Sequence, residues 1–147
     1  MVLSIHSLGP RGSRVPISMT IALLLALLVG ACAIPEESFD GCLEGDYYIN
    51  GTDPQDVEYS GLLTIATTPD PNQYSMQWII TGSVQEGTGT VTNGRLVAEW
   101  DAIEGYDAGS YGTAEYEISD NGELRGERIV TGQEGVGTEE AFPVRDG

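Results

Sequence analysis

Residues 73–82 decide the fold of this chain, and they read Gln-Tyr-Ser-Met-Gln-Trp-Ile-Ile-Thr-Gly. Large apolar side chains recur here at every second position, in Tyr74, Met76, Trp78 and Ile80. A period of two is typical of a β-strand that turns one face toward a core. The stretch therefore predicts a half-buried strand.

Similar short runs, rich in β-branched and aromatic residues, continue through the chain on both sides of this strand. They predict eight strands, near residues 44–50, 57–66, 73–82, 86–92, 95–100, 111–118, 123–131 and 135–142. Asn93-Gly94 is a strong signal for a tight hairpin, and Asn121-Gly122 marks the turn before the seventh strand. No stretch keeps a helical period long enough to indicate a helix.

Eight short antiparallel strands favour an all-β, up-and-down barrel, because closing the sheet removes its exposed edges. A two-sheet β-sandwich is the alternative. An internal repeat supports the barrel: Ile79–Gly82 followed by Glu86–Thr90 recurs as Ile129–Gly132 followed by Glu134–Thr138. The repeat predicts two similar half-barrels, and its Gly-x-Gly-Thr segments are expected to let the strands bend.

These strand and turn motifs resemble those of the calycin-like barrels of bacterial envelope lipoproteins. The resemblance rests on Gly45–Gly51, Tyr74–Trp78, the two Gly-x-Gly-Thr copies and Asn121–Gly126, and it covers most of the chain after residue 42. The general plan is also similar to that of lysozyme-inhibitor and protease-inhibitor lipoproteins of the periplasm, although their disulfides are missing here.

The first 31 residues predict an export signal, with Arg11 and Arg14 before an apolar run at 21–29 that is too short to span a membrane. Val29-Gly30-Ala31-Cys32 resembles the lipobox of bacterial lipoproteins, which implies cleavage before Cys32 and lipid on that cysteine. We therefore expect a signal at 1–31, a lipidated start and tether at 32–41, and a barrel at 42–147. Cleavage after Ala33 is the alternative, and it would release a soluble secreted protein.

The same resemblance implies a location in the cell envelope. Ala33 is not the aspartate that retains lipoproteins in the inner membrane, so an outer-membrane anchor is expected. Once Cys32 carries lipid or is removed, an intramolecular disulfide with Cys42 is not expected.

The chain is strongly acidic, with 23 acids, six arginines, no lysine and a formal net charge of −17. All the acids but only four of the arginines follow Cys32, so the mature part carries −19. This charge disfavours nucleic acid and anionic lipid surfaces as partners and favours cationic ones. An acidic surface that serves solubility alone, as in salty surroundings, is the more ordinary interpretation.

The repeat aligns Arg128 with Trp78 and predicts that both face the barrel interior. A buried arginine needs a carboxylate or a bound anion, and Glu139 is the candidate partner on the last strand. This hypothesis makes Arg128 the anchor of a ligand cavity. The more common arrangement is an arginine at the barrel rim that reaches water, or one turned outward by a register shift.

Six aromatic residues are candidates to line a cavity for a small apolar ligand: Tyr47, Tyr59, Tyr74, Trp78, Trp100 and Tyr116. In so small a barrel they are more often core, filling the interior. No cofactor is expected. The only calcium candidates that we single out are three acids in the predicted long loop, Asp101, Glu104 and Asp107. Their spacing does not match the EF-hand pattern.

Catalytic chemistry has little support, because the chain after Cys32 lacks both histidine and lysine. Serine triads and cysteine–histidine pairs are therefore excluded in their usual forms. We expect a non-enzymatic, membrane-anchored binding module for a protein partner or a small ligand. An inhibitor of a cationic hydrolase such as lysozyme is the alternative, followed by a carboxylate-dependent hydrolase.

Overall fold

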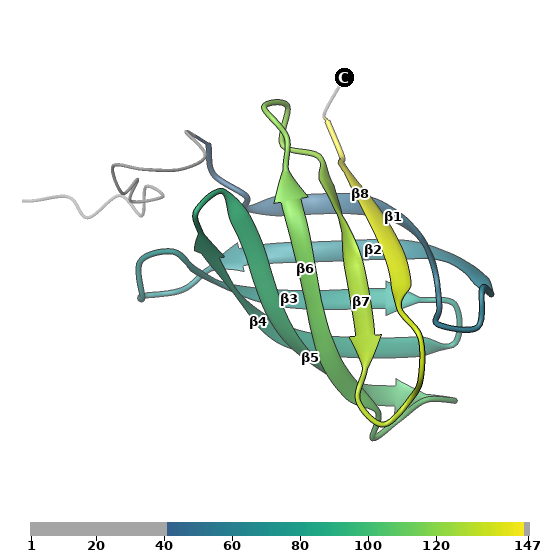
Figure 1. Cartoon of the computed structure of the whole chain (residues 1–147). Helices are drawn as coiled ribbons and strands as arrows, with labels where there is room; N and C mark the ends of the chain where they lie inside the picture. Colours follow the sequence, from purple (N-terminus) through teal and green to yellow (C-terminus); the bar gives the residue numbers. More distant parts are fainter. Residues whose placement is uncertain (1–40, 146–147) are drawn as a thin grey trace, which may run out of the picture. The chain divides into compact units, whose positions relative to one another are not determined.

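The structure, a computed structural model, describes residues 41–145 and shows a closed barrel of eight antiparallel strands. Each strand pairs with its neighbours in sequence, and β1 pairs with β8 to close the sheet (Figure 1). The predicted all-β, up-and-down barrel is therefore confirmed. The sandwich alternative is wrong, because one continuous sheet returns to its own first strand.

All eight predicted strands exist. They are β1 (Gly45–Thr52), β2 (Glu58–Thr67), β3 (Gln73–Ile80), β4 (Ser83–Thr92), β5 (Arg95–Gly105), β6 (Tyr111–Ile118), β7 (Leu124–Val130) and β8 (Gly137–Pro143). The turn at Asn93-Gly94 has φ angles of 51° and 74°, as the sharp hairpin between β4 and β5 requires.

Most strand boundaries shift from the predicted ones, and the shifts in β5 and β8 change the interpretation. The segment after Trp100, predicted as a long loop, extends β5 to Gly105, because Ala102 faces the interior and continues the alternation. The second Gly-x-Gly-Thr copy lies partly in the turn before β8, since Gly135 has a φ of 97° and the strand begins at Gly137. The β3–β4 connection is residues 81–82, whereas the β7–β8 connection is residues 131–136, so the two copies of the repeat form different hairpins.

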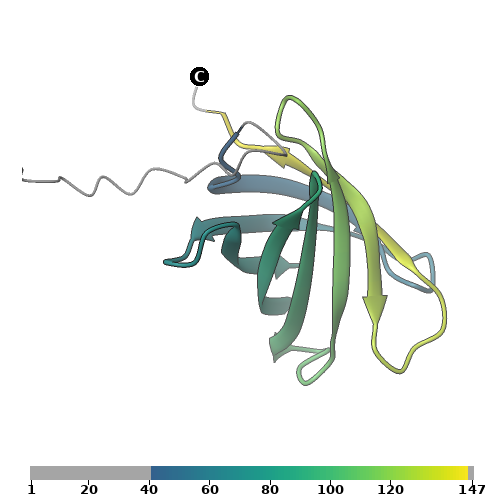
Figure 2. The same cartoon turned by 60° about the vertical axis from the view of Figure 1, so that its left-hand side comes forward.

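The two ends of the barrel differ (Figures 1 and 2). At one end, here called the closed end, the chain enters β1 and Leu43 is fully buried, with its carbonyl accepting a hydrogen bond of 2.8 Å from the Tyr47 hydroxyl. The opposite end, here called the mouth, carries the four connections that follow β1, β3, β5 and β7. The packed core therefore begins at the end where the chain enters.

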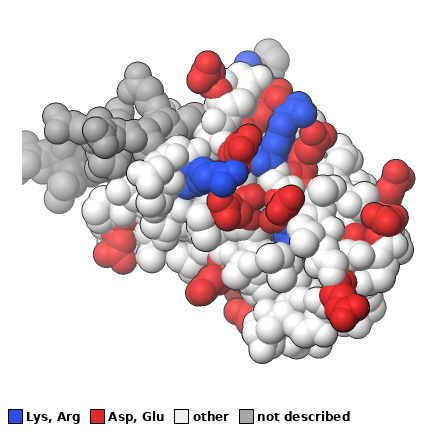
Figure 3. Space-filling model, in the orientation of Figure 1, with Lys and Arg blue, Asp and Glu red and all other residues white. Residues whose placement is uncertain are grey.

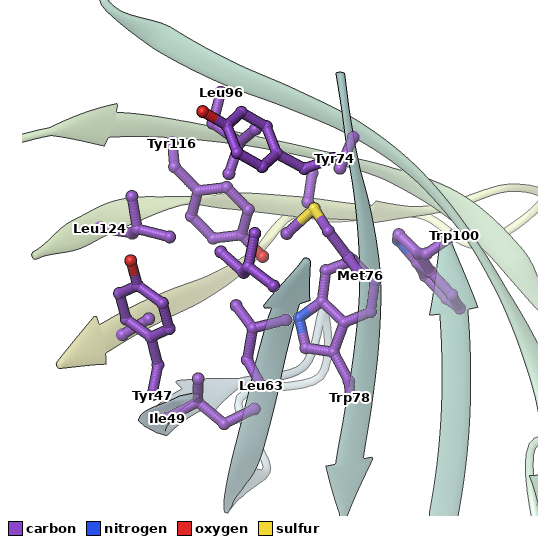
Figure 4. Packing of buried hydrophobic residues seen from close by; sticks show 14 of the residues in the cluster. Tyr47, Ile49, Leu63, Tyr74, Met76, Trp78, Leu96, Trp100, Tyr116 and Leu124 are labelled. Atoms are coloured by element: carbon purple, nitrogen blue, oxygen red, sulfur yellow. The ribbon is translucent and has the colours of Figure 1, made fainter. Parts of the chain in front are cut away.

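Apolar and aromatic side chains fill the interior from the closed end to the middle of the barrel (Figure 4). Trp78 and Tyr116 are fully buried there. A Cβ added to Gly89 would lie 2.7 Å from the Met76 sulfur and 2.8 Å from a Leu96 methyl carbon, so this glycine makes space for core side chains. Core filling is confirmed for this part of the barrel.

The outer surface carries both exposed ion pairs and exposed apolar side chains. Over β5–β8, the exposed arginines pair with glutamates, as in the Arg95–Glu115 contact of 2.7 Å and the Arg125–Glu140 contact of 2.8 Å; acids are dispersed across the face in Figure 3. Such exposed pairs contribute little to stability. On β1–β3, three exposed apolar residues stand side by side in register: Tyr48, Leu62 and Ile79.

The predicted signal, the lipidation site at Cys32 and the tether up to residue 40 lie outside the described residues, so these stay predictions. Cys42 is disulfide-bonded, which differs from the expectation that it forms no intramolecular disulfide. Within residues 41–145, no helix is long and apolar enough to cross a membrane.

Candidate functional site

The carboxylate of Glu139 lies inside the barrel, fully buried, and accepts four hydrogen bonds. Its Oε1 accepts from the Trp78 indole nitrogen at 3.0 Å and from the Tyr116 hydroxyl at 2.5 Å. Its Oε2 accepts from the Tyr59 hydroxyl at 2.7 Å and from Arg128 Nη1 at 2.9 Å. An ionised carboxylate offers about four acceptor positions, so all of them are occupied.

Two glycines beside Glu139 make room for its tyrosine donors. Glu139 on β8 lies opposite Gly51 on β1 and opposite Gly126 on β7. A Cβ on Gly51 would meet the Tyr59 ring at 2.5 Å, and one on Gly126 would meet the Tyr116 ring at 2.8 Å. Glu139 thus lies between two glycines on the neighbouring strands, and the rings of Tyr59 and Tyr116 occupy the space that side chains there would fill.

Arg128 reaches the same carboxylate from β7, and only 5% of the residue is exposed. Its guanidinium carbon lies 4.6 Å from the centre of the Trp100 ring and 5.2 Å from that of Trp78, so two aromatic faces cover the cation. The inward orientation and the pairing with Glu139 are confirmed. The more common arrangement, an arginine at the rim or turned outward, is wrong here because the buried carboxylate compensates the charge.

Burial and the charge of Glu139 together set the protonation states of Tyr59, Tyr116 and Arg128. Burial, and then the charge of Glu139, raise the pKa of Tyr59 and that of Tyr116 well above the usual value, so both hydroxyls keep their protons. Burial alone would lower the pKa of Arg128, but the neighbouring Glu139 outweighs it and the pKa is raised. Both tyrosines are therefore donors and the arginine is a cation at any ordinary pH.

A second set of hydrogen bonds leads from Arg128 toward the mouth. Arg128 Nη2 donates to Gln85 Oε1 at 2.6 Å, and Gln85 Nε2 donates to Asp107 Oδ2 at 3.0 Å. Gln85 is buried on β4, whereas Asp107 lies in the connection between β5 and β6. We call the series Glu139–Arg128–Gln85–Asp107 the polar relay; it fixes the orientation of the Gln85 amide.

A cavity of about 170 Å³ lies at the mouth, lined in part by the relay residues Gln85, Arg128 and Asp107 and by the ring of Trp100. Two buried polar atoms of its lining residues, Trp100 Nε1 and Asp107 Oδ1, have no hydrogen-bond partner within residues 41–145. Buried polar atoms without partners are rare in native proteins. The interior is thus filled toward the closed end and hollow at the mouth.

The predicted ligand-binding residues separate into three groups. Arg128 and Trp100 line the cavity, whereas Trp78 and Glu139 lie beneath it and support Arg128. Tyr74 is core near the closed end, opposite Gly89, and does not line the cavity, because it sits at the start of β3 rather than at its end.

The three acids named for calcium do not converge. Asp101 and Glu104 lie on the exposed side of β5, while Asp107 turns to Gln85. Residues 41–145 contain no group of three candidate metal ligands.

Sequence reasoning missed Gln85 altogether and named Tyr59 only among the aromatic residues. Gln85 and Ser83 are the buried polar members of an inward series on β4 that continues with Gly87 and Gly89. The strand predicted at 86–92 began one residue too late to include Gln85; extended back to Ser83, its alternation would have placed this polar side chain on the inner face.

Comparisons with known proteins show likeness in fold alone. No family model matches the chain, and no curated protein matches it. Among solved structures, it is similar to a redesigned β-barrel, mFAP1, bound to DFHBI, with a TM-score of 0.58, 13% identity, and coverage of 69% of this chain and 94% of that one.

Proposed function

We propose that this chain is an envelope lipoprotein whose barrel is a non-enzymatic binding module for a small ligand. The observation that carries the proposal is the cavity at the mouth, placed directly over the polar relay. A concave site with an apolar ring and a few oriented polar groups is the common form of a small-molecule site. The two polar atoms without partners supply positions that a ligand can satisfy.

The chain's entry point supports an anchored arrangement. Gly41 and Cys42 lie beside the turns of the closed end, near Gly94 and Asn121. A lipid on Cys32, only about nine residues before the barrel, would hold the closed end toward the membrane. The mouth would then open away from the membrane, where a ligand can enter.

Binding suits the buried carboxylate better than catalysis does. Both Glu139 oxygens are occupied by donors, so this side chain has no free position from which to exchange a proton with a substrate. Its role in the proposal is to hold Arg128 in place beneath the cavity.

Native mass spectrometry of protein purified gently from cell membranes tests the ligand. We expect a bound species that leaves on denaturation. Protein that is empty under all purification conditions, with a cavity that takes up no small molecule on screening, would contradict the proposal.

Metabolic labelling with a clickable fatty acid tests the anchor separately. The wild-type protein should be labelled, and Cys32→Ser should not be. Unlabelled protein that begins at Ile34 would show instead that the chain is secreted in soluble form.

A protein partner is the second candidate, favoured by the exposed row of Tyr48, Leu62 and Ile79 on an acidic chain. A cationic hydrolase such as lysozyme would match this chemistry, and its binding should weaken with salt. A lysozyme-inhibition assay at low and high salt decides it: inhibition that is lost in Leu62→Ser supports the candidate, and no inhibition at either salt excludes it.

A further inference from the structure

We infer that the cavity at the mouth is selective for a small organic cation, with Asp107 as the carboxylate that recognises it. The inference rests on the proposed small-ligand function and names the chemistry of the ligand. We expect a ligand with a primary ammonium or amidinium group, which donates to the carboxylate, on a compact apolar body, which fills the cavity.

The charges around the cavity disfavour an anion. Arg128, the one cation among the described residues that line it, is already neutralised by Glu139 at 2.9 Å and bonded to Gln85 at 2.6 Å. The other charged lining residues are Asp53 and Asp107. The polar relay and Asp53 together therefore carry more negative than positive charge, on a chain whose net charge is −17. An anion would have to enter against this field.

The two lining carboxylates differ in how they are used. Asp53 Oδ1 accepts the backbone N–H groups of Gln55 and Val57, both at 2.9 Å, and so organises the turn after β1. Asp107 accepts a single side-chain hydrogen bond, from Gln85 to Oδ2, and its Oδ1 is buried without a partner within the described chain. Asp107 is thus the carboxylate with capacity for a ligand.

The polar relay determines which oxygen of Asp107 is already occupied. Because Arg128 donates to the Gln85 oxygen, the Gln85 nitrogen must point the other way, toward Asp107 Oδ2. Asp107 lies in the connection between β5 and β6 and lines the cavity, so binding requires its side chain to turn Oδ1 toward the ligand. A ligand N–H then gives Oδ1 the partner it lacks, and a charge-assisted hydrogen bond forms.

The size of the cavity limits the rest of the ligand. At about 170 Å³ it is comparable to an engineered apolar cavity of about 150 Å³ that holds benzene. The apolar part of the cavity wall comes from Ile80, Val130 and Trp100. The ligand is therefore a cation with an apolar body of about the size of one aromatic ring.

Three probes of one size and different charge test the inference: benzylamine, benzyl alcohol and benzoate. Isothermal titration calorimetry should show the tightest binding for benzylamine and the weakest for benzoate. Tightest binding of benzoate would overturn the inference and indicate Arg128 as an anion anchor. No binding of benzylamine would overturn the inference, whereas the small-ligand function fails only if native mass spectrometry and screening also find no ligand, so the two failures are distinguishable.

Asp107→Asn tests the recognising group. It keeps an oxygen for Gln85 but loses the charge, and we expect benzylamine to bind about tenfold more weakly, as for loss of one charge-assisted hydrogen bond. Benzyl alcohol should bind as before. Asp101→Asn is the matched control, because it removes the same charge from the exposed side of β5. Equal losses in the two variants would show a general charge effect and contradict the inference.

Discussion

Arg128 donates a hydrogen bond of 2.9 Å to Glu139 from the neighbouring strand, and neither side chain is more than 6% exposed. The pair bridges β7 and β8 inside the barrel, at the boundary between the packed core and the cavity at the mouth. Each charge needs the other, because a lone buried charge is far less stable than a buried pair. The following predictions depend on this relationship and on the groups around it.

Replacing Glu139 with glutamine should lower the free energy of unfolding by about 3–5 kcal/mol, since it leaves Arg128 buried without a counter-charge. Urea denaturation measures the loss. The control is Glu140→Gln, the next residue, whose exposed pair with Arg125 should be worth less than about 1 kcal/mol. Equal losses at the two positions would contradict the assigned role of Glu139.

A double-mutant cycle isolates the pair itself. Arg128→Met combined with Glu139→Gln should cost less than the sum of the two single changes, because the second change removes the charge that the first leaves uncompensated. The same denaturation experiment gives the coupling free energy. Additive losses would mean that the two charges do not stabilise each other.

Tyr59→Phe and Tyr116→Phe each remove a donor to Glu139 while keeping the ring. Each should lower stability by about 1.5–3 kcal/mol, as expected for a hydrogen bond to a charged group. Tyr48→Phe is the control, since this exposed ring should tolerate the change within about 0.5 kcal/mol. A thermal or urea unfolding series compares the three variants, and a neutral Tyr116→Phe would refute the hydrogen-bond assignment.

Gly51→Ala should destabilise the barrel by about 1–3 kcal/mol, because the new methyl group meets the Tyr59 ring and the Thr138 carbonyl oxygen. Near-ultraviolet circular dichroism should also change as the tyrosine shifts. Asn50→Ala, the preceding and outward-facing residue, is the control and should leave both measurements nearly unchanged. An unchanged Gly51→Ala spectrum would show that the ring is not confined there.

The protein should lose stability as the pH rises above about 10. Burial raises the pKa of Tyr47 to about 12 and also raises the pKa of Tyr59 and that of Tyr116, while in the unfolded chain tyrosine ionises near 10. Above pH 10 the unfolded chain therefore releases protons that the folded one retains, which favours unfolding. Absorbance at 295 nm should show these tyrosines ionising only with unfolding, and titration of all seven near pH 10 in the folded state would contradict this.

Much of the architecture is readable from local patterns. A period of two gives each strand and its inner face, and the turn at Asn93-Gly94 follows from residues that adopt positive φ. The inward phase of Arg128 follows from its alignment with Trp78, and the need for a carboxylate follows from the cost of burying a charge. These are properties of one strand at a time.

What only the tertiary structure decided is the set of relations between strands far apart in the sequence. Tyr59 and Glu139 are 80 positions apart, and Gln85 and Arg128 are 43 apart. Whether such side chains meet depends on the register of every intervening strand, which no local pattern specifies. For the same reason, the sequence predicted a barrel and gave a buried arginine only as one of its alternatives. The closed sheet alone showed which end of the barrel is packed and which is hollow, and that Asp107 lies at the mouth.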